Sequence, residues 1–161
     1  MRTIRSAFRG IGALALLTLA LSCHSESRAP ASASPAAAGA ESASPTLYTR
    51  LGGEAGVRAV VAQFVANLAA DTRINHFFVD TDFDQLKNSL FNLIAQSTGG
   101  PQKYSGRDMK TTHAGLGVSG ADFDALIEDL RRALDQFKVE EREKGELIAL
   151  LEPMRKDVVE K

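Results

Sequence analysis

The sequence predicts an all-α fold with four principal helices and one long connection between the second and the third. Two observations carry this prediction. Along four segments beyond Thr46, apolar residues recur at steps of three and four, which is the spacing of an amphipathic helix. No segment shows the strict alternation of apolar and polar residues that is typical of a half-buried strand. A chain of 161 residues is about the size of one domain, so we expect one core.

The first two predicted helices cover residues 54–70 and 82–98. The apolar face of the first consists of Val57, Val60, Val61, Phe64, Val65 and Leu68. That of the second consists of Phe83, Leu86, Leu90, Phe91 and Ile94. Thr81 and Asp84 have the spacing of a capping box at the start of the second helix. We expect the run that begins with Gly99 and Gly100 to end this helix, because glycine favours the backbone turn found there.

The third and fourth predicted helices follow the long connection. The stripe of the third consists of Phe123, Leu126, Ile127, Leu130, Leu134 and Phe137. Ser119 and Asp122 have the spacing of a second capping box. The fourth begins near Glu140, and its apolar residues in register are Leu147, Leu150, Leu151, Met154 and Val158. Pro153 lies within this helix and is expected to bend it.

The first 23 residues have the layout of a secretory signal. Arginines precede an apolar stretch that ends two residues before Cys23, and the stretch is too short to span a bilayer permanently. Residues 24–45 are mainly alanine, serine and proline, a composition with little to bury, so we expect a disordered tether. The folded domain is therefore predicted over residues 46–161.

Cys23 is the only cysteine, which excludes an intramolecular disulfide. Apolar and small residues that end directly on a cysteine resemble the lipobox of bacterial lipoproteins, in which the thiol carries a lipid. Ala20 stands three residues before Cys23, where leucine is commoner in that motif, so plain cleavage and release is the alternative. Both interpretations export the protein, either to the periplasm or to a lipid-anchored position in the bacterial envelope.

Composition and charge exclude some classes of function. Hydrophobic residues make up 44% and charged residues 24% of the chain, as in ordinary soluble domains. A formal net charge of −1 gives no basic surface for a nucleic acid partner. The sequence shows no serine-histidine-aspartate arrangement, phosphate-binding loop, clustered cysteines or His-Glu-His metal spacing, which argues against a hydrolase or a zinc protein.

The connection over residues 99–119 is rich in glycine and has no helical period, and a loop of this length inside a small domain is usually functional. After the glycine pair it contains the run Tyr104, Gly106, Arg107, Met109, His113 and Gly115. This run resembles that of group I truncated haemoglobins, in which a glycine pair ends the E helix and the run leads to the iron-binding histidine. The segments at 47–54 and 71–78 also resemble the family's opening and its passage between the B and E helices. The similarity covers nearly all of residues 46–161.

The resemblance implies a two-over-two helical sandwich around haem b, with His113 as the proximal iron ligand through a neutral imidazole nitrogen. Phe78 matches the phenylalanine that stacks on the haem. Further residues are expected to line an apolar pocket, with simple core packing as the alternative for each: Phe64, Leu86, Leu90, Phe91, Ile94, Tyr104, Met109, Val118 and Phe123. Lys103 and Arg107 are candidates for pairing with haem propionates, or are solvated loop side chains.

The chain departs from its relatives on the side where the gas binds. Many truncated haemoglobins hold dioxygen with a tyrosine on the B helix and a glutamine or histidine on the E helix. The tyrosine position falls here on Val65 and the glutamine position on Leu90, and neither side chain donates a hydrogen bond. Ser89 is the nearest polar candidate, and His76 is a weaker one at a helix end. We therefore expect an apolar distal side that favours CO or NO over long-lived oxygen storage.

The function implied by the resemblance is reversible binding of a diatomic gas at the bacterial envelope, for oxygen handling or NO detoxification. NO dioxygenation would need a separate reductase, since the sequence shows no flavin or nicotinamide site. Two alternatives stay open. A haem-based electron-transfer or peroxidase-like protein would be favoured by a second strong ligand, for which His76 is the only other histidine of the domain. A haem-free helical lipoprotein would use the same frame as a binding module.

Overall fold

Four principal helices carry the fold, as the sequence predicts: α2 (Gly53–Ala70), α3 (Phe83–Ser97), α5 (Gly120–Gln136) and α6 (Glu141–Leu151). The computed structural model describes residues 44–161, so the predicted secretory signal, Cys23 and nearly all of the tether lie outside the described residues. Within the described range every regular element is a helix, and none of these helices is long and apolar enough to cross a membrane.

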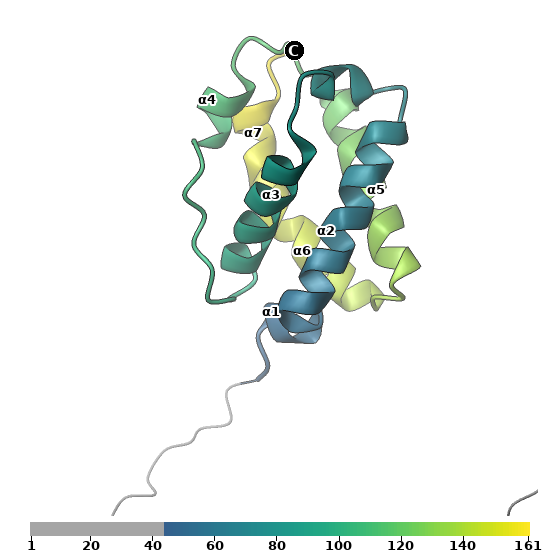
Figure 1. The fold of residues 1–161 in the computed structure, drawn as a ribbon, viewed down its shortest axis with the longest axis vertical. Coiled ribbons are helices and arrows are strands. Elements are labelled where there is room, and N and C mark those ends of the chain that lie inside the picture. Colours follow the sequence, from purple (N-terminus) through teal and green to yellow (C-terminus); the bar gives the residue numbers. More distant parts are fainter. Residues whose placement is uncertain (1–43) are drawn as a thin grey trace, which may run out of the picture. The chain divides into compact units, whose positions relative to one another are not determined.

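The helices are arranged in two pairs. α2 packs against both α3 and α5, and α5 contacts α6 (Figure 1). This confirms the predicted two-over-two sandwich of α2 and α3 against α5 and α6. Apolar side chains of α2, α5 and α6 meet in its centre and are fully buried: Val57, Val61, Leu68, Leu130, Leu134 and Leu147. Burying each such side chain stabilises the fold by roughly 1.5–3 kcal/mol. The predicted apolar faces therefore hold the two helix pairs together.

The two predicted capping boxes have different outcomes. Ser119 and Asp122 form theirs at the start of α5: the Asp122 amide donates to Ser119 Oγ over 3.2 Å, and the Ser119 amide donates to Asp122 Oδ2 over 2.8 Å. The box predicted between Thr81 and Asp84 is wrong. Asp82 caps α3 instead, because its carboxylate accepts from the amides of Asp84 and Gln85 over 2.9 and 3.1 Å. Aspartate is as good an N-cap as threonine, and here it is one residue nearer to the helix.

The connection between α3 and α5 is more ordered than its sequence indicates. It contains the short helix α4 (Met109–His113), whose N-cap Asp108 accepts from the Thr111 amide over 2.8 Å. This hydrogen bond from the Thr111 backbone amide is the main cause that holds the pKa of Asp108 below its usual range. A helix of one turn has no room for a repeating apolar pattern, so periodicity could not reveal it.

The predicted fourth helix is divided in the structure. α6 ends at Leu151, a 3-10 turn η2 follows over Glu152–Met154, and α7 covers Arg155–Val158. Pro153 lies at the start of η2, as expected from its inability to continue an α-helical hydrogen-bond ladder. The bend brings α7 against α4, and the two lie side by side in Figure 1.

Two further short elements were not predicted: α1 (Leu47–Arg50) and the 3-10 turn η1 (Asn75–Phe78). The Tyr48 amide donates to the Thr98 carbonyl over 2.9 Å, which joins α1 to the end of α3. α3 ends at the predicted glycine pair, with Gly99 at a φ of +84°. A Cβ on Gly100 would lie 2.8 Å from the Tyr48 ring and 2.9 Å from the Ala95 carbonyl oxygen, so a side chain has no room at this junction.

Candidate functional site

Two cavities of about 130 Å³ and 370 Å³ adjoin beneath α4. Their walls share six side chains, which come from η1, α3, α4, α5 and α7: Phe78, Leu86, His113, Phe123, Leu126 and Val158. We call the two cavities together the His113 cleft. Residues from 64 to 158 meet there, so the cleft forms only when the helix pairs and α4 have assembled.

The cleft gathers nine of the eleven residues that the sequence predicts for the pocket: Phe64, Phe78, Leu86, Leu90, Ile94, Met109, His113, Val118 and Phe123. The other two lie elsewhere. The Phe91 ring is buried beneath the Arg58 guanidinium, with Cζ 3.9 Å from its centroid, and so faces α2. The Tyr104 hydroxyl donates to the Arg107 carbonyl over 2.8 Å and so closes a turn of the connection.

His113 is the last residue of α4 and lines both cavities. Its Nδ1 atom lies 2.8 Å from the main-chain carbonyl oxygen of Met109. A carbonyl oxygen only accepts, so Nδ1 carries the ring proton and donates it, which leaves Nε2 with a free lone pair. Metal-binding histidines generally have this arrangement, because a partner on the second ring nitrogen fixes both the tautomer and the ring orientation.

The surroundings of His113 indicate what kind of metal it suits. Residues 44–161 contain no group of three or more histidine, cysteine, aspartate or glutamate side chains that could hold a metal ion. A single imidazole can therefore hold a metal only where a cofactor supplies the metal's other ligands. An apolar slot around a single imidazole fits the iron of a large flat ring, since such a slot buries the ring and excludes water.

The lining of the smaller cavity is apolar apart from His113. Leu90, which occupies the predicted glutamine position, lines it, whereas Val65 is buried and lines neither cavity of the cleft. Ser89 and His76 are both exposed and line neither cavity of the cleft. Neither of the two polar candidates from the sequence therefore reaches the cleft.

Polar groups gather at the larger cavity, where Thr81, Arg107, Thr112 and Asp122 form part of the wall. Arg107 is thus the one of the two basic candidates that reaches the cleft, and Lys103 is exposed outside it. Hydrogen bonds from the Ser119 hydroxyl and amide hold the pKa of Asp122 below its usual range. The Asp122 carboxylate is therefore ionised and engaged in the α5 cap.

Sequence reasoning missed ten apolar lining residues: Leu68, Ile74, Phe77, Leu93, Leu116, Leu126, Ile127, Leu151, Met154 and Val158. A signal existed for some of them. Leu126 and Ile127 belong to the predicted stripe of the third helix, and Met154 and Val158 belong to that of the fourth. Periodicity marks a buried face but not the partner that it faces, so the stripes alone do not assign these residues to the cleft.

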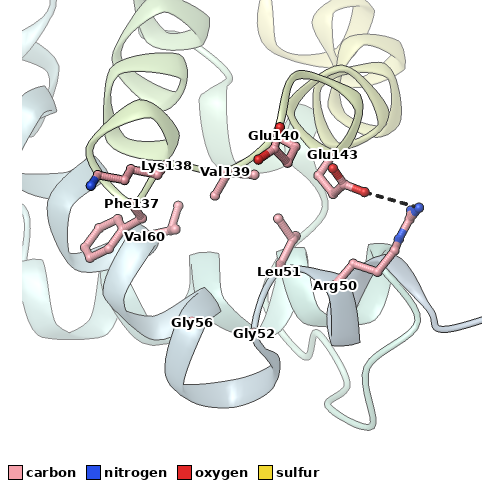
Figure 2. A pocket seen from close by; sticks show the side chains of 10 residues that line it. All are labelled: Arg50, Leu51, Gly52, Gly56, Val60, Phe137, Lys138, Val139, Glu140 and Glu143. Carbon is pink, nitrogen blue, oxygen red and sulfur yellow. Dashed lines mark ion pairs between the residues drawn. The ribbon is translucent and has the colours of Figure 1, made fainter.

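A second hollow of about 540 Å³ lies at the other end of the fold, between the start of α2 and the connection from α5 to α6 (Figure 2). Its apolar floor includes Leu51, Val60 and Val139. At its rim Arg50 pairs with Glu143 over 3.4 Å and also with Glu146. These carboxylates neutralise the charge of Arg50, and the residues that line the hollow include no histidine or cysteine.

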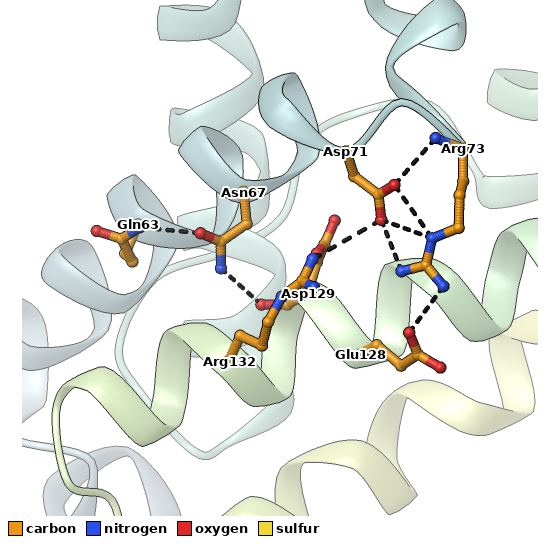
Figure 3. Close-up of polar contacts among 7 residues, drawn as sticks. All are labelled: Gln63, Asn67, Asp71, Arg73, Glu128, Asp129 and Arg132. Carbon is orange, nitrogen blue, oxygen red and sulfur yellow. Dashed lines mark hydrogen bonds and ion pairs between the residues drawn. The ribbon is translucent and has the colours of Figure 1, made fainter.

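A polar network joins the end of α2 to α5 (Figure 3). The Arg73 guanidinium donates to Asp71 Oδ2 over 2.7 Å and to Glu128 Oε2 over 2.8 Å. The Asn67 side chain donates to the Asp129 carbonyl over 3.0 Å. The hydrogen bonds from Arg73 lower the pKa of Asp71 to about 2. This network fixes the crossing of α2 and α5 and takes no part in lining the cleft.

Comparisons with known proteins agree with this architecture. A family model described as bacterial-like globin matches residues 46–160. A group 1 truncated haemoglobin from Tetrahymena pyriformis is 34% identical over 116 residues, which cover 72% of this chain and 96% of that protein. A group 1 truncated haemoglobin from Synechocystis is 37% identical over 100 residues, which cover 60% of this chain and 81% of that protein.

Solved structures match in the same region. The crystal structure of the Tetrahymena pyriformis truncated haemoglobin in its Fe(III) form has a TM-score of 0.70 at 34% identity, with 73% of this chain and all (100%) of that chain covered. The 2/2 haemoglobin of Synechococcus, solved with covalently attached haem, has a TM-score of 0.68 at 30% identity, with 73% and 100% covered. The fold and the cleft thus define a globin of the two-over-two class. The chain belongs to the bacterial-like globins, in the family of group 1 truncated haemoglobins.

Proposed function

We propose that this protein binds haem b through His113 and reversibly binds a diatomic gas in the His113 cleft. The observation that carries the proposal is the hydrogen bond from Nδ1 of His113 to the Met109 carbonyl, 2.8 Å long, at the wall of an apolar cleft. It leaves Nε2 as a neutral ligand for iron. Haem-based gas binding is also what membership of the truncated haemoglobin family implies.

The residues of the cleft fit the parts of the cofactor. Phe78 and Phe123 belong to both cavities, so their rings are available to pack against the porphyrin. Arg107 supplies a guanidinium at the more polar cavity, where a propionate carboxylate would pair with it. Haem, when bound, would supply the iron atom that binds the gas. The protein's part is to hold the proton on Nδ1 of His113, orient the ring and exclude water.

We propose further that the cleft favours CO and NO over long retention of dioxygen. Dioxygen bound by haem proteins carries partial negative charge, and a hydrogen-bond donor to such a group contributes about 1.5–3 kcal/mol. The smaller cavity has no donor side chain besides His113, which is committed to the iron in this proposal. Without that donor, dioxygen is released roughly 10- to 100-fold faster than from a relative that has one.

Absorption spectra of the reduced protein with and without CO test the proposal. We expect a Soret band after reconstitution with hemin, a shift of that band with CO, and loss of the band in His113→Ala. His76→Ala is the matched control, because His76 is exposed outside the cleft, and its spectrum should equal that of the wild type. A colourless wild type would instead support the haem-free binding module, and a six-coordinate spectrum abolished by His76→Ala would support the electron-transfer alternative.

Detoxification of NO is the enzymatic form of the proposal. The reaction NO + O2 + e⁻ → NO3⁻ consumes one electron per turnover, which a separate reductase would deliver. Nitrate production from NO and O2 in the presence of a chemical reductant tests the chemistry without that partner. If the reduced protein binds both gases separately but makes no nitrate above a hemin-only control, its role is gas binding alone.

We propose that the globin domain acts at the bacterial envelope, exported by the signal in residues 1–23 and anchored through a lipid on Cys23. Support for this comes from the sequence alone, since these residues lie outside the described range. Mass spectrometry of the purified membrane fraction should find a lipidated N-terminal cysteine. Cys23→Ser should move the protein out of that fraction, and an unchanged distribution would contradict the anchor.

A further inference from the structure

A single carboxylate, that of Glu160, binds the loop that follows His113. Its Oε1 atom accepts from the Gly115 amide over 2.7 Å, and its Oε2 atom accepts from the Gly117 amide over 2.5 Å. The main chain is joined at the same place, because the Glu160 amide donates to the Val118 carbonyl over 2.8 Å. Both carboxylate oxygens and the backbone of Glu160 are therefore engaged with the same loop of residues 114–118.

The loop is shaped to receive an anion. Gly115 and Gly117 have φ values of +83° and +68°, in the left-handed region that favours glycine. Successive amides in such a turn point to one side and form a concave anion-binding surface. A Cβ on Gly115 would meet nothing within 4 Å, so glycine is required at this position by its backbone conformation and not by lack of space. The amide hydrogen bonds hold the pKa of Glu160 below its usual range, so the carboxylate is ionised at neutral pH.

The loop is in turn attached to His113. The Leu116 amide donates to the main-chain carbonyl of His113 over 3.1 Å. The main helical partner of α4 is α7, the helix that leads directly to Glu160. Val158 of α7 lines both cavities and belongs to a small buried cluster with Val118 and Phe123, which Met109 joins from α4. The end of α4 that carries His113 is thus held by the segment of residues 155–161.

We propose that Glu160 is a positioning residue for His113: by holding the amides of Gly115 and Gly117, its carboxylate fixes the end of α4 and so the orientation of the imidazole in the cleft. The inference rests on the proposed function, because it takes His113 as the iron ligand. It goes beyond that function because it states that Glu160, 47 positions after His113 in the sequence, controls the strength and direction of the iron–imidazole bond.

The experiment compares full-chain variants reconstituted with hemin. Glu160→Gln keeps the shape of the side chain but removes its charge and one of its two acceptors, and Glu160→Ala removes both acceptors. Asp157→Asn is the matched control, since Asp157 is a carboxylate three residues earlier that makes no side-chain hydrogen bond to residues 44–161. Gly115→Ala perturbs the same contact from the loop side, because alanine is strained at a φ of +83°.

The readout is the iron–histidine stretching band in resonance Raman spectra of the reduced protein, together with the rate of haem transfer to apomyoglobin. We expect both Glu160 variants and Gly115→Ala to shift and broaden the band and to lose haem several-fold faster, whereas Asp157→Asn matches the wild type. Glu160→Asp, which is ionised but one methylene shorter, should restore part of the wild-type band.

Two results would overturn the inference while leaving the proposed function intact. The first is a wild-type band in every Glu160 variant. The second is faster hydrogen exchange at the Gly115 and Gly117 amides with no change in the band, which would mean that the carboxylate holds the loop but not the imidazole. Failure of the proposed function looks different: the wild-type protein itself would show no iron–histidine band, and His113→Ala would bind hemin equally well.

Discussion

The Nδ1 atom of His113 lies 2.8 Å from the carbonyl oxygen of Met109, one helical turn earlier in α4. This hydrogen bond exists only because residues 109–113 are helical. The orientation of the proposed iron ligand therefore depends on the stability of a helix of five residues, which is too short to form without help from its cap and its neighbours.

Removing the cap of α4 should loosen the proposed iron ligand. Asp108→Ala deletes the acceptor for the Thr111 amide, so the first turn of α4 loses its side-chain cap. We expect faster haem loss, measured by transfer to apomyoglobin, and a broader iron–histidine band. Asp108→Asn is the control, because asparagine caps a helix about as well as aspartate. Equal haem loss from Asp108→Ala and Asp108→Asn would show that the cap does not control the ligand.

A donor placed in the smaller cavity should slow the release of dioxygen. Leu90 lines that cavity and occupies the position at which related proteins carry glutamine. Leu90→Gln is expected to lower the dioxygen off-rate roughly 10- to 100-fold, in line with one added hydrogen bond to a partially charged ligand. CO dissociation should change far less, since CO depends less on a donor. Stopped-flow and flash-photolysis measurements give both rates.

Ser89→Ala serves as the matched control for this experiment. Ser89 precedes Leu90 on α3, but its side chain is exposed and lines neither cavity of the cleft. Its removal should leave both off-rates unchanged. The wild type could instead release dioxygen slowly, with no further decrease of the off-rate in Leu90→Gln. That result would mean that another donor reaches the bound gas, and the proposal of an apolar gas-binding side would be wrong.

The sequence predicted the four principal helices and the two-over-two arrangement, and nine of the residues that it assigned to the pocket line the cleft, because each of these depends on long apolar stripes or on a distinctive motif. The sequence-based predictions were incomplete or wrong where the structure depends on a single helical turn or a single side-chain contact. α4 has only five residues, and the cap of α3 differs from the predicted one by one position. Phe91 lies on the predicted apolar stripe yet faces Arg58 rather than the cleft, since periodicity cannot say which of two neighbours a buried side chain meets.

Glu160 shows a second limit of sequence reasoning. It lies 47 residues beyond His113 and belongs to no apolar stripe or motif. Its link to the cleft becomes visible only when α7 is placed against α4. The two glycines that receive it, Gly115 and Gly117, were the one available signal, since their positive φ values require a residue without a side chain.

The Asp71–Arg73 pair should make stability depend on pH in the acid range. The pKa of Asp71 is about 2 in the folded protein because of hydrogen bonds from Arg73, and it is near 3.8 without them. A lowered pKa in the folded state stabilises the fold above the unfolded pKa, and this contribution is lost as the pH falls from about 4 toward 2. Urea unfolding at several pH values should therefore show a stability gap between the wild type and Asp71→Asn that closes over this window.

Asp80→Asn is the control for the pH experiment, because Asp80 is exposed and makes no side-chain hydrogen bond within residues 44–161. Its stability should follow the wild-type curve at every pH. A gap for Asp71→Asn that persists unchanged down to pH 2 would mean that the variant is destabilised through packing and not through the charge of Asp71.

Gly145 and Gly100 should respond to replacement by alanine in opposite directions. Gly145 is exposed in the interior of α6, and a Cβ there would meet nothing within 4 Å. Gly145→Ala should raise the free energy of unfolding by about 0.5–1 kcal/mol, because alanine loses less backbone entropy in a helix. Gly100→Ala should lower it by roughly 1–3 kcal/mol, since its Cβ would lie 2.8 Å from the Tyr48 ring and 2.9 Å from the Ala95 carbonyl oxygen. Denaturant unfolding measures both changes. Gly100→Ala in a Tyr48→Ala background tests whether the ring causes the loss of stability. If the added methyl lowers the free energy of unfolding by the same amount without the ring, the clash with Tyr48 is not the cause.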